Sequence, residues 1–171
     1  VVDPIAIAPI FLALTPGMTQ QERERIARRA VLVGGLILVA FALAGEAILD
    51  FIGISMAAFR VAGGILLFLT ALDMLFERRT KRREDSSTEN DPTHAEDPSV
   101  FPLGIPLIAG PGAIASVILL VGEKPGGEGL ITVFGILAVV LLMMYAMLRL
   151  SSYLEKRVGK VAINVFTRIF G

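Results

Sequence analysis

Residues Ser99 to Gly122 have the sequence SVFPLGIPLIAGPGAIASVILLVG, which carries no charged side chain over 24 positions. A transmembrane helix needs about 20 mainly apolar residues to cross the hydrocarbon core of a bilayer. The stretch has this length, but residues 102–112 contain three prolines and three glycines. Proline has no N–H and clashes with the preceding helical turn, so each proline frees backbone carbonyl groups. The stretch therefore predicts a membrane-spanning helix that is broken.

Further uncharged stretches lie on both sides of this one. Gly129 to Leu148 covers 20 residues, and Ala30 to Gly45 covers 16 before Glu46. The chain is 54% hydrophobic and 19% charged, whereas soluble domains are about 45–50% apolar and about 25% charged. In 171 residues these stretches leave little material for a soluble domain. The composition indicates a multi-pass α-helical membrane protein.

Six membrane segments are predicted, and polar segments separate them. The first segment ends at about Leu14, and the sixth begins at Val161. The four between them span about Ala30–Leu49, Met56–Phe76, Val100–Val121 and Leu130–Leu148. Pro4 and Pro9 are expected to interrupt the first segment. Residues 22–29 and 151–160 have charges at helical spacing beside apolar positions and predict amphipathic connections. The chain starts with Val1 and stops at Gly171 inside an apolar segment, so we expect a fragment with truncated first and last helices.

Thirteen of the 16 Lys and Arg residues lie on alternate loops, and the even-numbered loops hold Lys124 alone. The odd-numbered loops hold Arg23, Arg25, Arg28 and Arg29, then Arg78, Arg79, Lys81, Arg82 and Arg83, then Arg149, Lys156, Arg157 and Lys160. Because Lys and Arg stay in the cytoplasm, loops 15–29, 77–98 and 149–160 are expected there, with the N-terminus outside the inner or plasma membrane. The zero net charge gives no indication of nucleic acid as a partner.

Two short matches suggest an internal repeat. Pro4-Ile5-Ala6-Ile7 corresponds to Pro102-Leu103-Gly104-Ile105, and Arg60-Val61-Ala62-Gly63 corresponds to Arg168-Ile169-Phe170-Gly171. Residues 1–76 and 99–171 would then be two three-helix repeats, joined by the charged loop 77–98. Three segments per half give the halves opposite orientations, which is typical of secondary transporters. Chance similarity in Leu-, Ile- and Gly-rich sequence is the alternative.

The paired proline-rich stretches are the candidate substrate site. Broken backbone is tolerated in a bilayer only where it is buried in protein or lines a wet cavity. Half-helix ends offer N–H groups to a carboxylate and carbonyl groups to an ammonium, which suits a zwitterion such as an amino acid. The alternative is simple kinks that aid helix packing. The candidate substrate-binding residues are Asp3, Pro4, Ala6, Pro9, Pro102, Gly104, Pro106, Gly110, Pro111, Gly112 and Ser116.

Ionisable residues inside membrane segments are the gating or coupling candidates, since each costs roughly 2.5–3.5 kcal/mol at a helix centre. Glu46 or Asp50 is placed to pair with Arg60 across a short loop, and Arg168 is the counterpart of Arg60. An interfacial ion pair or snorkelling side chains is the alternative. Asp3 has two candidate roles, a helix cap or a coupling group. Asp73 is expected to be a solvated interfacial acid.

Small-residue pairs and the few remaining polar groups have simpler interpretations. Gly34-Gly35 and Gly63-Gly64 permit close helix approach. His94 is the single histidine and the chain has no cysteine, so we expect no metal site and no cofactor. No Gly-x-Ser-x-Gly or His-Glu-x-x-His motif supports an intramembrane enzyme. A non-transporting membrane scaffold or stress protein remains the alternative to a transporter.

The motifs of this chain resemble the MarC family of bacterial and archaeal inner-membrane proteins. The resemblance covers nearly the whole chain. It is carried by Asp3-Pro4 with Pro9-Ile10-Phe11, Ile26-Ala27-Arg28-Arg29-Ala30, Gly45-Glu46, Phe51, Gly53-Ile54-Ser55, Ala58-Phe59-Arg60-Val61-Ala62-Gly63-Gly64, Phe101 to Ile114, and Arg168-Ile169-Phe170-Gly171.

The resemblance implies six transmembrane helices and membership of the LysE-like transporter superfamily. Some relatives are described as transporters of small neutral amino acids such as glycine and alanine. Many relatives have Gly-Asn where this chain has Ala6-Ile7, so the chain lacks an amide that would be a natural ligand. The expected partners are a small-molecule substrate and the lipid bilayer, with H⁺ or Na⁺ as the candidate coupling ion and homo-oligomerisation left open.

Overall fold

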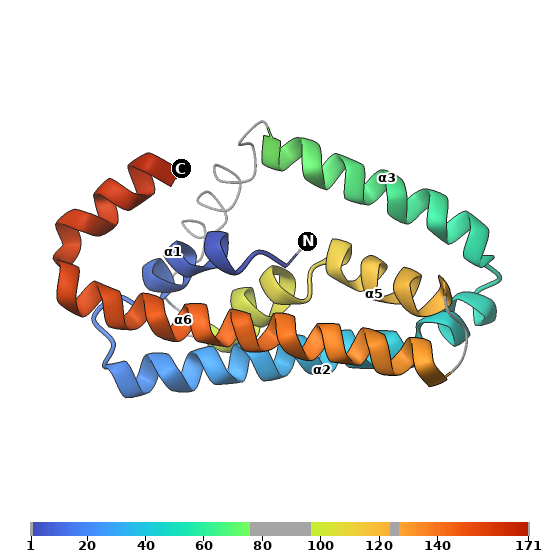
Figure 1. The fold of residues 1–171 in the computed structure, drawn as a ribbon, viewed down its shortest axis with the longest axis horizontal. Helices are drawn as coiled ribbons and strands as arrows, with labels where there is room; N and C mark the ends of the chain where they lie inside the picture. Colours follow the sequence, from blue (N-terminus) through green and yellow to red (C-terminus); the bar gives the residue numbers. More distant parts are fainter. Residues whose placement is uncertain (1, 76–96, 124–126, 171) are drawn as a thin grey trace.

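The structure, a computed structural model, consists of helices and their connections over the residues that it describes (Figure 1). These are residues 2–75, 97–123 and 127–170, with side chains described to residue 72 in the first range and to residue 153 in the last, residue 128 excepted. The elements are α1 (Pro4–Leu14), α2 (Gln20–Phe51), α3 (Met56–Leu75), η1 (Ser99–Ile108), α5 (Pro111–Glu123) and α6 (Gly127–Phe170). The all-α prediction is confirmed. Most of loop 77–98, with His94, lies outside the described residues.

α2 begins with a capping box and is longer than the predicted membrane segment. The Thr19 hydroxyl accepts a hydrogen bond from the Glu22 N–H at 3.3 Å, and the Glu22 carboxylate accepts one from the Thr19 N–H at 2.8 Å. No proline or capping signal follows until Gly53, whose positive φ of 77° ends the helix. Residues 22–29 are therefore the first turns of α2 rather than a separate amphipathic connection.

α6 likewise joins elements that the sequence analysis separated. It runs from Gly127 to Phe170 and includes the predicted fifth segment, the connection 151–160 and the start of the sixth segment. Figure 1 shows its ribbon changing direction towards the C-terminal end. The proposed boundary at Val161 is therefore not a break in helical structure.

Two helices are long and apolar enough to cross a membrane by length and composition. They are α2 and the part of α6 from Gly129 to Tyr153. η1 and α5 would form a third span if the bent pair is counted as one. α1 and residues Met56–Leu72 of α3 are apolar but shorter. The described structure thus supports two or three of the six predicted spans, and the inverted relation between the halves stays a prediction.

The interior consists of two apolar clusters stacked along α2 and α6. The first core contains Ile7, Phe11, Ile26, Ala27, Ala30, Leu103, Leu107, Ile108, Met144 and Leu148. The second core contains Leu38, Ala42, Ala109, Ala113, Val117, Val133 and Leu137. α1 and η1 contribute to the first core and α5 to the second, while α3 packs mainly against α5. Large apolar side chains such as Phe51 and Ile131 are exposed, as expected of surfaces that face lipid.

Gly34 and Gly35 let two neighbouring helices approach α2 closely. A Cβ at Gly34 would lie 2.5 Å from Ile108 of η1, and one at Gly35 would lie 2.9 Å from Leu141 of α6. The predicted packing role of this pair is confirmed. In α3 the prediction holds for Gly63, which faces α5, whereas Gly64 has no atom within 4 Å of a Cβ position.

Candidate functional site

The first proline-bearing stretch is a continuous helix. Pro4 occupies the first position of α1, where its missing N–H costs little. The Asp3 carboxylate accepts hydrogen bonds from the N–H groups of Ile5 at 3.0 Å and Ala6 at 3.1 Å. Pro9 lies within α1 and cannot donate to the Ile5 carbonyl. The predicted interruption of the first segment is wrong for the described residues, and Asp3 has the capping role.

The second stretch is broken twice within η1. Phe101 has φ −125° and ψ 130°, and Ile105 has φ −132° and ψ 126°. Both residues precede a proline, whose ring disfavours the helical conformation of the residue before it. The last turn of η1 is wider than an α-helical turn, because the Ala109 N–H donates to the carbonyl of Gly104, five residues earlier, at 2.9 Å. The prediction that the fourth segment is broken is confirmed.

A further change of direction separates η1 from α5. The two elements are bent by 53° relative to each other across residues 109–110. The backbone of Gly110 passes so close to Pro106 that a Cβ would lie 2.6 Å from its carbonyl oxygen. The Gly110 carbonyl accepts a hydrogen bond from the Ile114 N–H at 3.0 Å and so begins α5. Because glycine has no side chain that could accept a hydrogen bond, the residue at this position does not cap the N–H groups of the first turn of α5.

The two proline-rich stretches meet at one place in the bundle. Ile7 and Phe11 of α1 share the first core with Leu103 and Leu107 of η1. Val2, just before α1, packs against both cores. Figure 1 shows the N-terminal end of α1 beside the connection between η1 and α5. The break at residues 109–110 therefore lies at the boundary between the two cores, next to the capped start of α1.

This place is close to the middle of the longest charge-free interval of α2. Gly34 and Leu38, which face η1 and the second core, lie between Arg29 and Glu46. At about 1.5 Å per residue they are about 8–14 Å from Arg29 and about 12–18 Å from Glu46 along the helix axis. The interval itself is about 26 Å, close to the thickness of a hydrocarbon core. The break therefore lies near the middle of this uncharged interval, which would be mid-depth if α2 crosses the bilayer.

The predicted substrate-binding residues differ in burial. Gly104 and Gly112 are buried; Asp3, Pro4, Ala6, Pro102, Gly110 and Ser116 are half-buried; Pro9, Pro106 and Pro111 are exposed. A Cβ at Gly104 would lie 3.2 Å from Val33 of α2, which identifies Gly104 as a packing position. The Ser116 hydroxyl donates to the Gly112 carbonyl of its own helix at 2.8 Å. The polar groups nearest the break are thus mainly backbone groups.

The gating candidates lie away from this place. Glu46, Asp50 and Arg60 are exposed, and none of the three forms an ion pair with another described residue. The side chains of Asp73 and Arg168 are outside the described residues. Within the described ranges, no three Asp, Glu or His side chains gather closely enough to hold a metal ion.

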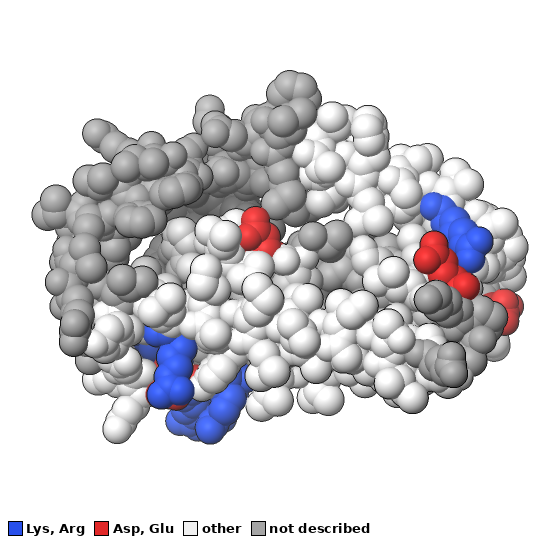
Figure 2. Space-filling view, in the orientation of Figure 1, with Lys and Arg blue, Asp and Glu red and all other residues white. Residues whose placement is uncertain are grey.

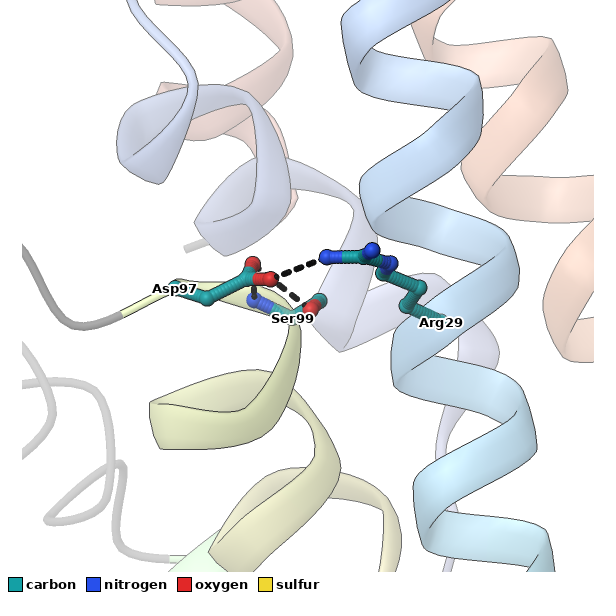
Figure 3. A network of polar contacts seen from close by, with 3 residues as sticks. All are labelled: Arg29, Asp97 and Ser99. Atoms are coloured by element: carbon teal, nitrogen blue, oxygen red, sulfur yellow. Dashed lines mark hydrogen bonds and ion pairs between the residues drawn. The ribbon is translucent and has the colours of Figure 1, made fainter.

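Polar contacts that the sequence analysis missed gather at the opposite end, where α2 begins. Arg29 forms an ion pair of 2.7 Å with Asp97, which also accepts hydrogen bonds from the Ser99 hydroxyl at 2.6 Å and the Ser99 N–H at 3.1 Å (Figure 3). The Ser99 hydroxyl and N–H, together with Arg29, hold the pKa of Asp97 below its ordinary value, against a smaller effect of partial burial. This network fastens the start of η1 to α2.

Two more contacts tie α2 to its neighbours at the same end. The buried Arg23 donates from Nη2 and Nε to the Thr15 carbonyl at 2.8 and 3.2 Å, at the C-terminal end of α1. Glu24 accepts a hydrogen bond from the Tyr145 hydroxyl at 3.2 Å and lies 3.5 Å from Arg149, both on α6. The Asp-Pro-Ser sequence at residues 97–99 was a local signal for a cap, but nothing local identified the partners.

These features define an α-helical integral membrane protein organised around a broken, bent pair of helices, η1 and α5. Figure 2 shows the charges gathered towards the ends of the molecule, with an almost entirely uncharged middle. The chain belongs to the MarC family of integral membrane proteins, whose family model matches residues 1–171.

Relatives of similar length have been found in bacteria and archaea. The chain is 38% identical to the UPF0056 membrane protein YvbG of Bacillus subtilis over 99% of its length and 81% of the relative. It is 35% identical to the UPF0056 membrane protein MJ1677 of Methanocaldococcus jannaschii, over 100% of the chain and 83% of the relative. It is 32% identical to the UPF0056 membrane protein YhcE of Escherichia coli, over 99% of the chain and 79% of the relative. No solved structure matches the chain significantly.

Proposed function

We propose that the protein is a secondary transporter that moves a small polar solute, a neutral amino acid, by alternating access. The observation that carries the proposal is the double break and 53° bend of the η1–α5 segment at mid-depth. Irregular backbone at this depth is tolerated where it is enclosed by protein or lines a wet cavity. Broken helices of this kind form the solute sites of many transporters.

The groups at the break suit a zwitterion. The first turn of α5 carries N–H groups beside Gly110, and helix N-termini favour a carboxylate. Pro9 cannot donate to the Ile5 carbonyl, and the nearby Asp3 carboxylate adds negative charge for an ammonium group. These groups bind and orient a solute, and they include no pairing of a nucleophile with a base. The proposal is therefore transport without catalysis.

The proposal includes an orientation and a wider relationship. The basic loops 15–29, 77–98 and 149–160 would face the cytoplasm and the N-terminus the outside of the inner membrane. The halves 1–76 and 99–171 would be inverted repeats of the LysE-like transporter superfamily. H⁺ or Na⁺ would be the coupling ion. Arg60 in the first half and Arg168 in the second would serve as gating or coupling residues.

The test is solute flux into proteoliposomes, measured with a panel of radiolabelled neutral amino acids. We expect flux of at least one of them, which Gly110→Ala reduces by about tenfold or more, because the added Cβ meets the Pro106 carbonyl and overpacking costs about 1–3 kcal/mol. Gly135→Ala on α6 is the matched control, since its Cβ would meet no atom within 4 Å.

Thermal unfolding and gel filtration of both variants separate a transport defect from misfolding. Equal flux in the folded Gly110→Ala variant and the wild type would contradict the site assignment. A folded wild-type protein that moves no solute of the panel would favour a membrane scaffold instead.

A further inference from the structure

One face of α2 changes from basic to apolar along the helix and stays exposed throughout. Arg25, Arg28, Leu32, Leu36 and Leu43 follow one another at spacings of three, four, four and seven residues. In a helix of 3.6 residues per turn these positions share one face. Leu32, Leu36 and Leu43 are 57%, 68% and 60% exposed. We name these five residues the α2 stripe.

The two arginines of the stripe are free of protein partners within the described residues. Arg23 is engaged with the Thr15 carbonyl and Arg29 with Asp97, whereas neither Arg25 nor Arg28 forms a hydrogen bond or ion pair with the described part of the chain. Both side chains are exposed.

The neighbouring acids Glu22 and Glu24 make their contacts elsewhere and form no ion pair with Arg25 or Arg28. The Glu22 carboxylate is occupied by the N–H and hydroxyl of Thr19, each at 2.8 Å. Glu24 is shared between Tyr145 and Arg149. Figure 2 shows Lys and Arg gathered over the end of the molecule where α2 begins. Positive charge therefore stays available there, directly next to apolar surface.

The order of groups along the stripe matches the cross-section of one bilayer leaflet. Arg25 and Arg28 are three residues apart, so their side chains are neighbours and can reach the same anion. Leu32 follows one turn deeper and Leu36 two turns deeper, at about 6 and 12 Å from Arg28 along the axis. A phosphate bound by the arginines would thus have acyl chains beside the leucines.

We propose that the α2 stripe binds an anionic phospholipid of the bilayer, its headgroup phosphate held by Arg25 and Arg28 and its acyl chains packed along Leu32 and Leu36. Guanidinium groups recognise phosphate through paired, charge-assisted hydrogen bonds. Net negative lipid is favoured over zwitterionic lipid because neither Arg25 nor Arg28 has an acidic partner in the part of the chain that the structure describes. The site is independent of whether the protein transports a solute.

The test compares lipid binding by the purified full chain in neutral detergent. Phosphatidylglycerol and phosphatidylcholine with identical acyl chains are titrated, and bound lipid is counted by native mass spectrometry while the melting temperature is recorded. We expect phosphatidylglycerol to bind more tightly and to raise the melting temperature more. Arg25→Gln with Arg28→Gln should weaken its binding by about 30-fold, equivalent to about 2 kcal/mol at about 1 kcal/mol per basic residue.

Arg60→Gln is the matched control, because Arg60 is an exposed arginine at the other end of the bundle. It should keep wild-type affinity, whereas Leu36→Ser should lower the affinity for the lipid without removing its phosphate contacts. Equal phosphatidylglycerol affinity in the double variant and wild type would overturn the proposal. An equal rise in melting temperature with inorganic phosphate alone would also overturn it, since that result would indicate a free-anion site. So would a loss of phosphatidylglycerol affinity in Arg60→Gln as large as in the double variant, which would indicate general charge attraction.

Discussion

Arg23 shows how a charged residue is accommodated inside this protein. Its side chain is only 6% exposed, and two of its nitrogen atoms donate to the single carbonyl of Thr15. The Thr15 side chain, also buried, donates to the Phe11 carbonyl at 2.8 Å. Arg23 thereby satisfies the end of α1, where helical carbonyls lack partners, and fixes the corner between α1 and α2.

Removing this guanidinium should destabilise the protein. In Arg23→Met the Thr15 carbonyl loses both hydrogen bonds in a buried place, and hydrogen bonds to charged groups contribute about 1.5–3 kcal/mol. We expect the free energy of unfolding in detergent, measured by SDS titration, to fall by about that amount. Arg25→Met, in detergent without anionic lipid, is the exposed control and should change the free energy of unfolding little. Equal losses in the two variants would show that the hydrogen bonds from Arg23 to the Thr15 carbonyl are not the cause.

Asp97 makes a contribution to stability that depends on pH. Its pKa is lowered in the folded protein, so its carboxylate stabilises the fold above the unfolded pKa, near 3.8, and this stabilisation is lost as pH falls through the lower folded value. Because Asp97 and Arg29 are 39% and 48% exposed, the effect should be below about 1 kcal/mol.

Asp97→Asn tests this dependence. We expect a small loss of melting temperature at pH 6 that shrinks once the pH falls below about 4, where the carboxyl of the unfolded chain becomes protonated, and that disappears below the lowered pKa of the folded protein. A melting curve recorded at half-unit steps between pH 3 and 6 measures the difference. A gap between variant and wild type that stays constant down to pH 3 would show that charge is not the cause.

At the scale of the elements, glycines set how closely α2 meets its neighbours. Gly34 faces Ile108 of η1, and Gly45 faces Ile118 of α5, each with 2.5 Å left for a Cβ. Gly34→Ala should therefore lower the free energy of unfolding by about 1–3 kcal/mol through overpacking. Gly64→Ala in α3 has open space and should be neutral or stabilising by up to about 1 kcal/mol. Equal effects would show that η1 gives way freely.

The break in the fourth segment was predictable because its cause is local. Pro102 and Pro106 disfavour the helical conformation at Phe101 and Ile105, and both residues are extended. The first segment was predicted wrongly because the same residue type has a different effect at the start of a helix, where Pro4 follows the cap Asp3.

The length of α2 and the polar contacts at its start were not predicted. The sequence Thr19 to Glu22 is a capping box, and a helix starting there should have been expected to continue through residues 22–29. The ion pair between Arg29 and Asp97 joins residues 68 apart, and the Tyr145–Glu24 hydrogen bond joins residues 121 apart. Such pairs depend on how helices pack, which a single sequence does not encode locally.

At the scale of the whole molecule, α2 is longer than a bilayer requires. Its 32 residues extend over about 48 Å, against about 30 Å of hydrocarbon. If α2 crosses the bilayer, its first turns, with Arg23, Arg25, Arg28 and Arg29, would lie in the headgroup region and the water on one side. Gly53 and Ser55, beyond the other end, would lie on the opposite side.

The absence of native cysteine allows a direct test of orientation. Gln21→Cys and Ser55→Cys place single thiols at exposed positions on opposite sides. In intact cells we expect a membrane-impermeant maleimide to label Ser55→Cys at once and Gln21→Cys only after the membrane is permeabilised. The reverse pattern would invert the proposed topology, and labelling of both in intact cells would contradict a span between them.

Because the break lies between the two cores, a movement at the break would affect one core more than the other. A rotation of α5 about residues 109–110 would repack the second core, while the first core, with its three polar fastenings to α2, kept its structure. α3, which packs mainly on α5 and joins α2 through the left-handed Gly53, would be carried along. In such a movement α1, η1, the start of α2 and the end of Gly129–Tyr153 would stay fixed, whereas α3 and α5 would move together.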